Sequence, residues 1–226
     1  MRLNIHETPD FKKALERKAP VRLPMLTVLR DHPVPMLLGT LGAFATFVLF
    51  YLMTVFSLGH GTAVLGYSRE QFLLMQMAGM LFFALGIPLS ARYGDRWGTR
   101  RTMIVASVLI VGFGVLFAPL FQPHSPWLVT GFLCLGLFLM GLTYGPCGTF
   151  LAEIYPVEVR YTGASLSFNL AGILGAAPAP YLATWLAEHF GLVAVGYYLC
   201  LTAVATLCAL VALHRRALRS VSYTHL

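Results

Sequence analysis

Charged side chains are scarce in this 226-residue sequence, in which Asp, Glu, Lys and Arg together make up 11% of the residues. Acidic side chains are the scarcest of these, with 9 Asp and Glu against 16 Lys and Arg, while 58% of the residues are hydrophobic. A soluble chain of this composition has too little polar surface to cover its own core. The composition therefore excludes a soluble globular fold and predicts an integral membrane protein.

Cysteine is also rare, and its spacing carries no metal signal. The chain has four cysteines, all inside uncharged stretches and none in a C-x-x-C pair: Cys134, Cys147, Cys200 and Cys208. This spacing indicates neither a zinc site nor a disulfide framework. We expect buried, unreactive thiols, no metal site and no cofactor.

Long uncharged runs, in contrast, are abundant. Each is long enough, at roughly 20 residues or more, to cross a bilayer as a helix. There are six of them: Val34–Leu58, Gln71–Ala91, Thr102–Phe121, Trp127–Ala152, Gly163–Leu186 and Leu192–Leu213. The sequence thus predicts an all-α membrane protein with six transmembrane helices.

The basic residues lie almost entirely on one side of these predicted spans. Fifteen of the 16 precede the first span, lie in the second or fourth loop, or follow the last span, and Arg69 alone lies on the other side. Basic residues near span ends stay cytoplasmic. Both termini are therefore predicted to be cytoplasmic, and the net charge of +7 is explained without a nucleic-acid partner.

A weak internal repeat divides the six spans into two groups of three. The segment Gln76-Met-Ala-Gly in the second span resembles Asn169-Leu-Ala-Gly in the fifth. The two segments run in opposite directions through the membrane, and inverted three-helix repeats are typical of secondary transporters. The third and sixth spans carry the fewest polar residues, so we expect them to brace the bundle from outside while the other four line its interior.

Helix-breaking residues interrupt the fourth and fifth spans. Gly145 and Pro146 lie near the end of the fourth span, and Pro178 and Pro180 lie within the fifth. Each proline removes a helical hydrogen bond. These positions are candidate hinges, and a static kink is an equally good interpretation.

The second loop carries a recognisable motif, GDRWGTRR at residues 94–101. It resembles the loop G-x-L-x-D-R-x-G-R-R that joins the second and third helices of each half in the major facilitator superfamily. Ala91 and Thr99 depart from that pattern, where the motif has glycine and a basic residue. The resemblance places Asp95, Arg96, Gly98, Arg100 and Arg101 in a cytoplasmic gate, in which the aspartate accepts helix-start amides, the glycine allows the turn and arginines contact phosphates.

A longer stretch narrows the resemblance. AEIYPVEVRYTGAS at residues 152–165, NLAGILG at 169–175 and APAP at 177–180 are similar to the tenth-to-eleventh helix region of the metabolite:proton symporters, which include carriers of shikimate, 2-oxoglutarate, citrate and proline or betaine. The resemblance adds Glu153, Pro156, Arg160 and Gly163 to the gate residues, and we expect Arg96 to pair with Glu153.

The resemblance implies half of a twelve-helix fold, made of helices seven to twelve. Residues 1–32 would be a cytoplasmic central-loop segment, 33–214 the six-helix bundle and 215–226 a cytoplasmic tail. Residues 220–226 resemble translated sequencing adapter more than a family tail, which favours a non-native origin for them. Glu70, Glu153 and Glu188 all fall at span ends, so the proton-coupling groups would lie in the absent N-terminal half.

The implied function is secondary active transport in the bacterial cytoplasmic (inner) membrane. A small organic acid or zwitterionic metabolite and a proton would cross together by alternating access, and the partners would be the lipid bilayer and a missing six-helix half. We place six polar or aromatic side chains on the substrate path, although each is as well explained by packing between helices: Phe47, Tyr51, Thr54, Gln76, Tyr144 and Asn169.

Two other functional classes remain as alternatives. An intramembrane serine protease would need a base beside Ser165, but His60, His124 and His189 fall in the opposite loops, so we predict that the chain is not an enzyme. Solvated loop side chains are also the preferred interpretation of these histidines over a metal site. The second alternative is a stand-alone six-helix protein, either a homodimeric carrier or a scaffold, without proton-coupled transport of its own.

Overall fold

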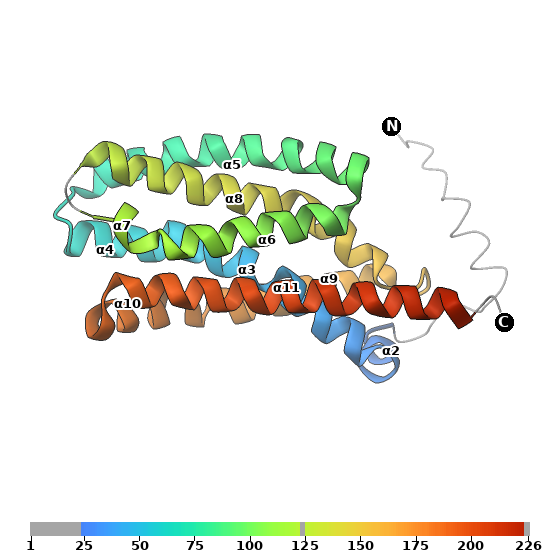
Figure 1. Cartoon of the computed structure of the whole chain (residues 1–226). Coiled ribbons are helices and arrows are strands. Elements are labelled where there is room, and N and C mark those ends of the chain that lie inside the picture. Colours follow the sequence, from blue (N-terminus) through green and yellow to red (C-terminus); the bar gives the residue numbers. More distant parts are fainter. Residues whose placement is uncertain (1–23, 123–124, 224–226) are drawn as a thin grey trace, which may run out of the picture.

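The computed structural model describes residues 24–122 and 125–223, with side chains placed up to Leu213. Within these ranges all regular structure is helical (Figure 1). The elements are α2 (Pro24–Asp31), α3 (Pro33–Tyr51), the π-turn η1 (Leu52–Phe56), α4 (Ser57–Ala63), α5 (Arg69–Trp97), α6 (Thr99–Val115), α7 (Phe117–Leu120), α8 (Pro126–Glu153), α9 (Arg160–Ala176), α10 (Pro178–Phe190) and α11 (Leu192–Tyr223). Most of the predicted central-loop segment and the last three residues lie outside the described ranges.

Within the described residues, five helical stretches are long and apolar enough to cross a membrane: Pro33–Ala63, Arg69–Trp97, Pro126–Glu153, Arg160–Phe190 and Leu192–Leu213. The third predicted span, Thr102–Phe121, differs from the expectation of one continuous helix. It is divided at Leu116 into α6 and the short α7. Pro119 explains the division, because it has no N–H for the carbonyl of Val115 and its ring clashes with that carbonyl in a regular helix.

The loops that hold the basic residues gather at one end of the bundle. The α5–α6 turn, the α8–α9 connection, α2 and the end of α11 lie on the right in Figure 1, whereas α4 and α7 lie on the left. Helix α11 continues past Leu213 to Tyr223, so the predicted tail begins as a helical extension of the last span.

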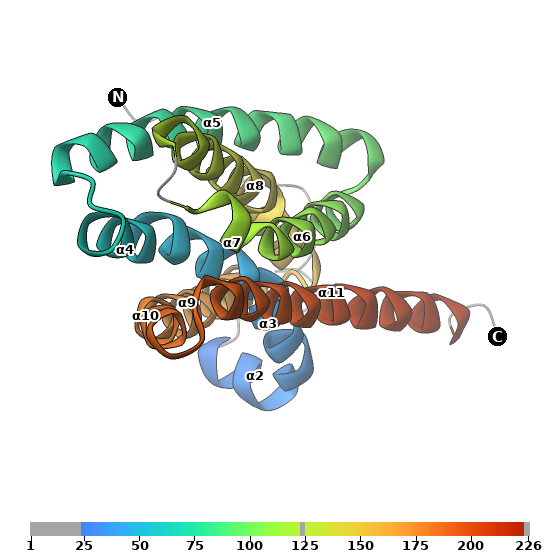
Figure 2. The same ribbon diagram turned by 60° about the vertical axis from the view of Figure 1, so that its left-hand side comes forward.

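The helix packing follows the predicted inverted repeat of two three-helix units. The first unit contains α3, α5 and α6, and the second contains α8, the α9–α10 pair and α11. Helix α3 packs against α9 and α11, and in the same way α8 packs against α5 and α6 (Figures 1 and 2). The third helices of the units, α6 and α11, pack against each other. Exchange of the two units thus reproduces the same set of neighbours.

Glycines allow two of these helix pairs to approach closely. A Cβ atom on Gly141 of α8 would lie 2.5 Å from the Phe83 carbonyl oxygen of α5, and one on Gly86 of α5 would lie 2.7 Å from the Phe138 carbonyl oxygen. In the α6–α11 pair, a Cβ atom on Gly114 would lie 2.9 Å from the carbonyl oxygen of Gly196. Small residues at such contacts bring the helix backbones together, which is how membrane helices gain packing energy.

Phenylalanines fill the core at the end of the bundle opposite the basic loops. The five rings are Phe56, Phe72, Phe117, Phe121 and Phe132, each at most 3% exposed. Phe121 and Phe132 stack with centroids 4.8 Å apart, and Phe117 meets Phe132 edge to face at 4.9 Å. These geometries add to the dispersion energy of the buried rings, so this end is tightly packed. The four cysteines are free thiols, of which Cys147 is buried, Cys134 and Cys200 are half-buried and Cys208 is exposed. The expectation of burial therefore holds for Cys147, is met only in part by Cys134 and Cys200, and is wrong for Cys208.

Candidate functional site

The first span departs from α-helical geometry in the middle of the predicted substrate path. Residues 52–56 form a π-turn, in which the Ser57 amide donates to the Leu52 carbonyl five residues earlier. The Ser57 hydroxyl donates to the same oxygen at 2.7 Å. A π-turn leaves carbonyls without their usual α-helical donors, and such turns are frequent at functional sites.

Gln76 of α5 supplies the missing donor. Its side-chain amide nitrogen donates to the Met53 carbonyl at 2.9 Å and to the Thr54 carbonyl at 2.7 Å. The Gln76 side chain is buried, so this pair of bonds satisfies backbone groups that water cannot reach. The structure thus gives Gln76 a specific contact, in which its amide bridges from α5 to the π-turn η1.

A row of aromatic rings crosses the open face of the bundle. Phe47 of α3 meets Phe168 of α9 edge to face at 4.9 Å, Phe168 lies 6.4 Å from Tyr144 of α8, and Tyr144 lies 5.7 Å from Phe83 of α5. Tyr144 remains 39% exposed. Four helices from both three-helix units therefore present one amphipathic surface.

The other predicted path residues occupy different surroundings. Tyr51 is half-buried beside Phe50, with ring centroids 5.2 Å apart. The Thr54 hydroxyl donates to the Phe50 carbonyl at 2.7 Å. Asn169 is exposed, and its amide donates to the Ser165 carbonyl at 2.8 Å, one turn earlier on α9. The structure brings Phe47 and Tyr144 together through Phe168, and it brings Gln76 to Thr54.

The predicted hinge positions differ in how tightly they are packed. Gly145 lies against α5, where an added Cβ atom would be 2.8 Å from the Ile87 carbonyl oxygen, and the adjacent Pro146 is buried. Pro178 starts α10 directly after the break at Ala177 between α9 and α10, and Pro180 follows within that helix. The fifth span is thus divided at its proline pair, whereas the fourth remains one helix.

The α5–α6 turn is built on Gly98. Its φ of +93° lies in the region that strains any residue with a Cβ atom. Asp95 and Arg96 are exposed on the last turn of α5. Among the described contacts there is no ion pair between Arg96 and Glu153, and the Thr99 hydroxyl instead donates to the Glu153 carboxylate at 3.3 Å. The threonine that departs from the family motif therefore makes the contact to α8 that we expected of an arginine.

The α8–α9 connection is anchored by Tyr155. Its hydroxyl shares a 2.6 Å hydrogen bond with Ser167 of α9, and Ser167 lies 3.4 Å from the Met36 carbonyl of α3. Burial raises the pKa of the Tyr155 phenol, against a smaller lowering by the bond to Ser167. Arg160 donates from Nε to the Tyr155 carbonyl at 3.4 Å, and Gly163 packs against the Tyr155 ring. Pro156 and Glu153 are exposed at the rim.

Sequence reasoning missed several of the residues that organise these surfaces. Phe83 and Phe168 complete the aromatic row, and Tyr155 and Ser167 hold the α8–α9 connection. Tyr155 lies within the symporter-like stretch, so the resemblance offered a signal for it. The row has no such signal, because its rings come from separate helices.

The described residues contain no group of three or more His, Cys, Asp or Glu that could hold a metal ion. Ser165 lies in the second turn of α9, at the end of the bundle with the basic loops, whereas His60 and His189 belong to the opposite end. His124 lies outside the described residues. A serine nucleophile with a histidine base is therefore not assembled among Ser165, His60 and His189.

Two inverted three-helix units with an open amphipathic face define a polytopic helical membrane protein of the transporter class. The sequence comparison names the family: the profile of the Major Facilitator Superfamily matches residues 36–222. The chain belongs to this superfamily, and relatives named as metabolite transport proteins support the resemblance to its metabolite:proton symporters. Its six-helix bundle is half of the major facilitator fold.

Similar curated proteins carry transporter names. The chain is 44% identical over 219 residues to the inner membrane metabolite transport protein YhjE of Escherichia coli strain K12, covering 95% of this chain and 50% of that protein. It is 27% identical over 219 residues to the citrate-proton symporter of Klebsiella pneumoniae, covering 96% and 49%. It is 25% identical over 197 residues to the shikimate transporter of E. coli strain K12, covering 84% and 44%. The chain thus spans about half the length of the curated relatives that it matches.

Proposed function

We propose that this chain is the C-terminal half, helices seven to twelve, of a proton-coupled symporter for a small organic acid or zwitterionic metabolite. The half-length match to metabolite transporters and the inverted three-helix units support this assignment. Alternating access then proceeds by rocking of this bundle against a six-helix N-terminal half. The coupling proton is carried in that other half, since Glu70, Glu153 and Glu188 lie at helix ends or their caps.

The observation that carries the proposal is the open face shared by α3, α5, α8 and α9. Tyr144 is partly exposed there and Asn169 is exposed, while the aromatic row holds Tyr144 in place through Phe83 and Phe168. Polar groups on an apolar surface at a helix-unit interface suit a small ligand with a few polar contacts. Phe47 and Tyr51 of α3 and Thr54 of η1 extend the same path. Gln76 affects this path by holding the π-turn in place.

Transport by the joined halves tests the assignment. We expect no proton-driven uptake by the chain alone in vesicles, and uptake when the chain is joined to the N-terminal half of a metabolite transporter relative. In the joined protein, Tyr144→Phe or Asn169→Ala should raise the KM by about tenfold, because each substitution removes one to two polar contacts to the substrate. Thr184→Ala is the matched control, since this exposed hydroxyl bonds its own helix at Pro180. Accumulation by the chain alone, or an equal effect of the control, contradicts the proposal.

The gate assignment concerns the two connections at the basic end. We propose that Asp95, Arg96, Gly98, Arg100 and Arg101 of the α5–α6 turn, with Glu153, Pro156, Arg160 and Gly163 of the α8–α9 connection, hold the cytoplasmic gate closed in the outward-open state. Asp95 is exposed, which suits a contact with a helix start of the other half. A charge-assisted contact is worth about 1.5–3 kcal/mol, which changes a two-conformer ratio roughly tenfold or more.

Asp95→Asn in the joined protein therefore shifts the population toward the inward-open state and slows uptake. The measurements are the accessibility of a cysteine in the cytoplasmic cavity and the uptake rate per molecule. A loss of protein from the membrane with unchanged accessibility would make the turn a topology anchor instead.

The hinge assignment of Gly145, Pro146, Pro178 and Pro180 predicts in the same assay that Pro178→Ala changes the conformer ratio.

We further propose that both termini face the cytoplasm. In a variant without native cysteines, a cysteine at Tyr161, which is 88% exposed, should resist a membrane-impermeant thiol reagent in intact cells. A cysteine at Ser125, at the opposite end of the bundle, should react. The reverse labelling pattern overturns the orientation.

A further inference from the structure

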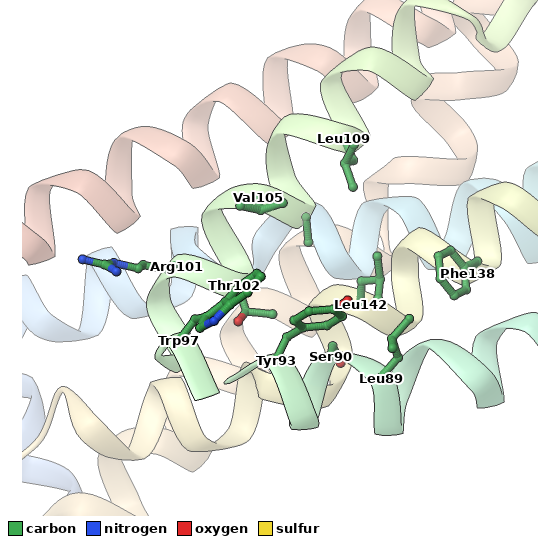
Figure 3. Close-up of a pocket in the computed structure, with 11 residues that line it drawn as sticks. Leu89, Ser90, Tyr93, Trp97, Arg101, Thr102, Val105, Leu109, Phe138 and Leu142 are labelled. Carbon is green, nitrogen blue, oxygen red and sulfur yellow. The ribbon is translucent and has the colours of Figure 1, made fainter. Parts of the chain in front are cut away.

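A cavity of about 420 Å³ opens between α5, α6 and α8, on the half of the bundle that carries the α5–α6 turn (Figure 3). Its wall is apolar and is formed by Leu89, Val105, Leu109, Phe138 and Leu142. Leu89, Val105 and Leu109 are 40%, 60% and 47% exposed. The cavity therefore opens to the outside of the bundle, where a membrane protein meets lipid chains.

The polar groups in the wall are already satisfied by the protein. The Ser90 hydroxyl donates to the Ile87 carbonyl at 2.9 Å and lies 3.3 Å from the Gly141 carbonyl. The Thr102 hydroxyl donates to the Gly98 carbonyl at 3.2 Å. A polar solute thus finds few free partners along this wall, whereas a hydrocarbon chain fills it at no hydrogen-bonding cost.

The end of the cavity near the turn has the opposite character. The rings of Tyr93 and Trp97 lie 5.1 Å apart, and the Arg101 side chain extends away from the apolar wall (Figure 3). Arg92 and Arg96 lie near the end of α5 and Arg100 lies in the first turn of α6, so all three are close in sequence to this end of the cavity. Aromatic residues and arginines together mark the interfacial layer of a membrane, and a basic pocket between helices there attracts anionic headgroups.

The cavity and the proposed substrate path lie on different sides of α8. Leu142 lines the cavity and Tyr144 belongs to the aromatic row. Two residues separate by about 200° around a helix of 3.6 residues per turn, so these side chains point in nearly opposite directions. An N-terminal half that covers the aromatic row leaves this cavity facing the bilayer.

We infer that the cavity binds an anionic phospholipid, with one acyl chain between α5, α6 and α8 and the phosphate beside Arg101. The inference rests on insertion of the chain in a membrane and on none of the transport chemistry. Apolar wall, interfacial aromatic pair and cationic rim follow one another in the order in which a phospholipid presents its chain, its interfacial region and its headgroup.

Fluorescence quenching of Trp97 tests the inference on the full chain. Trp127→Phe and Trp185→Phe leave Trp97 as the only tryptophan, and the chain is placed in vesicles of fixed total anionic lipid in which either phosphatidylglycerol or phosphatidylcholine carries brominated chains. We expect brominated phosphatidylglycerol to quench at about fivefold lower mole fraction, the selectivity given by one basic residue near the surface.

Arg101→Gln should abolish this selectivity, and Arg92→Gln should preserve it, because Arg92 is an exposed arginine of α5 that does not line the cavity. Val105→Phe should fill the cavity and weaken quenching by both lipids. Circular dichroism verifies that each variant is folded, and native mass spectrometry of the otherwise unaltered chain and its Arg101→Gln variant measures phosphatidylglycerol retention independently of the tryptophan changes.

Three results would overturn the inference. Equal quenching by the two lipids shows ordinary lipid contact, and equal effects of Arg92→Gln and Arg101→Gln show a general attraction to surface charge. Loss of quenching on joining the N-terminal half, or at high protein-to-lipid ratio, shows that protein covers the cavity. Failure of transport by the joined protein leaves these readouts unaffected, so the two proposals fail separately.

Discussion

Helices α3 and α8 begin the first spans of the two three-helix units, and the regular α-helical hydrogen bonding of each span is interrupted at nearly the same distance from its start. The π-turn begins at Leu52, 19 residues after Pro33, and Pro146 lies 20 residues after Pro126. Because the two units are inverted, these irregularities lie toward opposite ends of the bundle. The two units thus carry an interruption at matching places, but its chemistry differs, a π-turn in one and a proline in the other.

The contacts that hold the two irregularities also differ. The π-turn is held by a side chain, Gln76, which donates to two carbonyls of η1. The region before Pro146 is held by backbone contact, since Gly141 and Gly145 lie directly against α5. A side-chain contact is lost with one substitution that keeps the shape, whereas a backbone contact is lost only by forcing the helices apart. The two ends of the bundle are therefore sensitive to different substitutions.

Of the substitutions that test this comparison, Gly141→Ala should reduce the stability of the protein most. The new Cβ atom would lie 2.5 Å from the Phe83 carbonyl oxygen and 3.1 Å from the Gly86 Cα atom, and neither backbone atom can move alone. We expect a loss of about 1–3 kcal/mol in the free energy of unfolding, measured by denaturation in detergent micelles. Gly148→Ala on the same helix is the control, because a Cβ atom there meets no heavy atom within 4 Å. Equal losses in both variants would show that the close contact does not limit packing.

Gln76→Leu should have an intermediate effect at the other irregularity. It preserves the size of the side chain but removes the donor to Met53 and Thr54, at a cost of about 1 kcal/mol. Hydrogen exchange should accelerate at the amides of residues 52–57, as measured by mass spectrometry of peptides from that segment. Met77→Leu, at a neighbouring position that is 65% exposed, should leave exchange unchanged. Unaltered exchange in Gln76→Leu would mean that the π-turn is stable without the hydrogen bonds from Gln76.

Thr99→Val should have the smallest effect, at the end of α8 beyond Pro146. It removes one exposed hydrogen bond to Glu153, worth about 0.5 kcal/mol or less at the surface. Thr99→Arg places an arginine where the family motif has a basic residue. It should raise the free energy of unfolding by about 0.2–1 kcal/mol, and high salt should screen this gain. Double-mutant cycles with Glu153→Gln measure the coupling energy between the side chain at position 99 and Glu153. A coupling energy of zero for Thr99, or a coupling energy insensitive to salt in Thr99→Arg, contradicts the contact.

The architecture could be predicted from the sequence alone, but little of the candidate site could. Uncharged runs, the inverted repeat and the family motif predict the six-helix bundle, because a bilayer imposes length and apolarity on every span. The division at Leu116 was missed although Pro119 lies inside the predicted run, since run length counts apolar residues and ignores the hydrogen bond that a proline removes.

The repeat segments show why side-chain contacts were harder to predict. Gln76 and Asn169 occupy matching positions in the two units, and both were expected on the substrate path. In the structure Gln76 is buried against the π-turn, whereas Asn169 is exposed and bonds only its own helix. Their difference comes from the helix opposite each of them, and no local pattern in the sequence reports that neighbour.

Helix α5 touches both irregularities, the π-turn at Gln76 and the glycine segment of α8 at Ser90, and it stays helical between them although Pro88 lies inside this stretch. Ser90 follows Gln76 by 14 positions, which corresponds to about 21 Å along the helix axis at 1.5 Å per residue. A tilt of about 10° about the Gln76 contact displaces Ser90 by about 4 Å, more than a packed helix interface tolerates. The two ends of the bundle therefore differ in chemistry but are connected by one helix. A tilt of α5 that accompanies a change of shape at one end would displace the α5 contact at the other end.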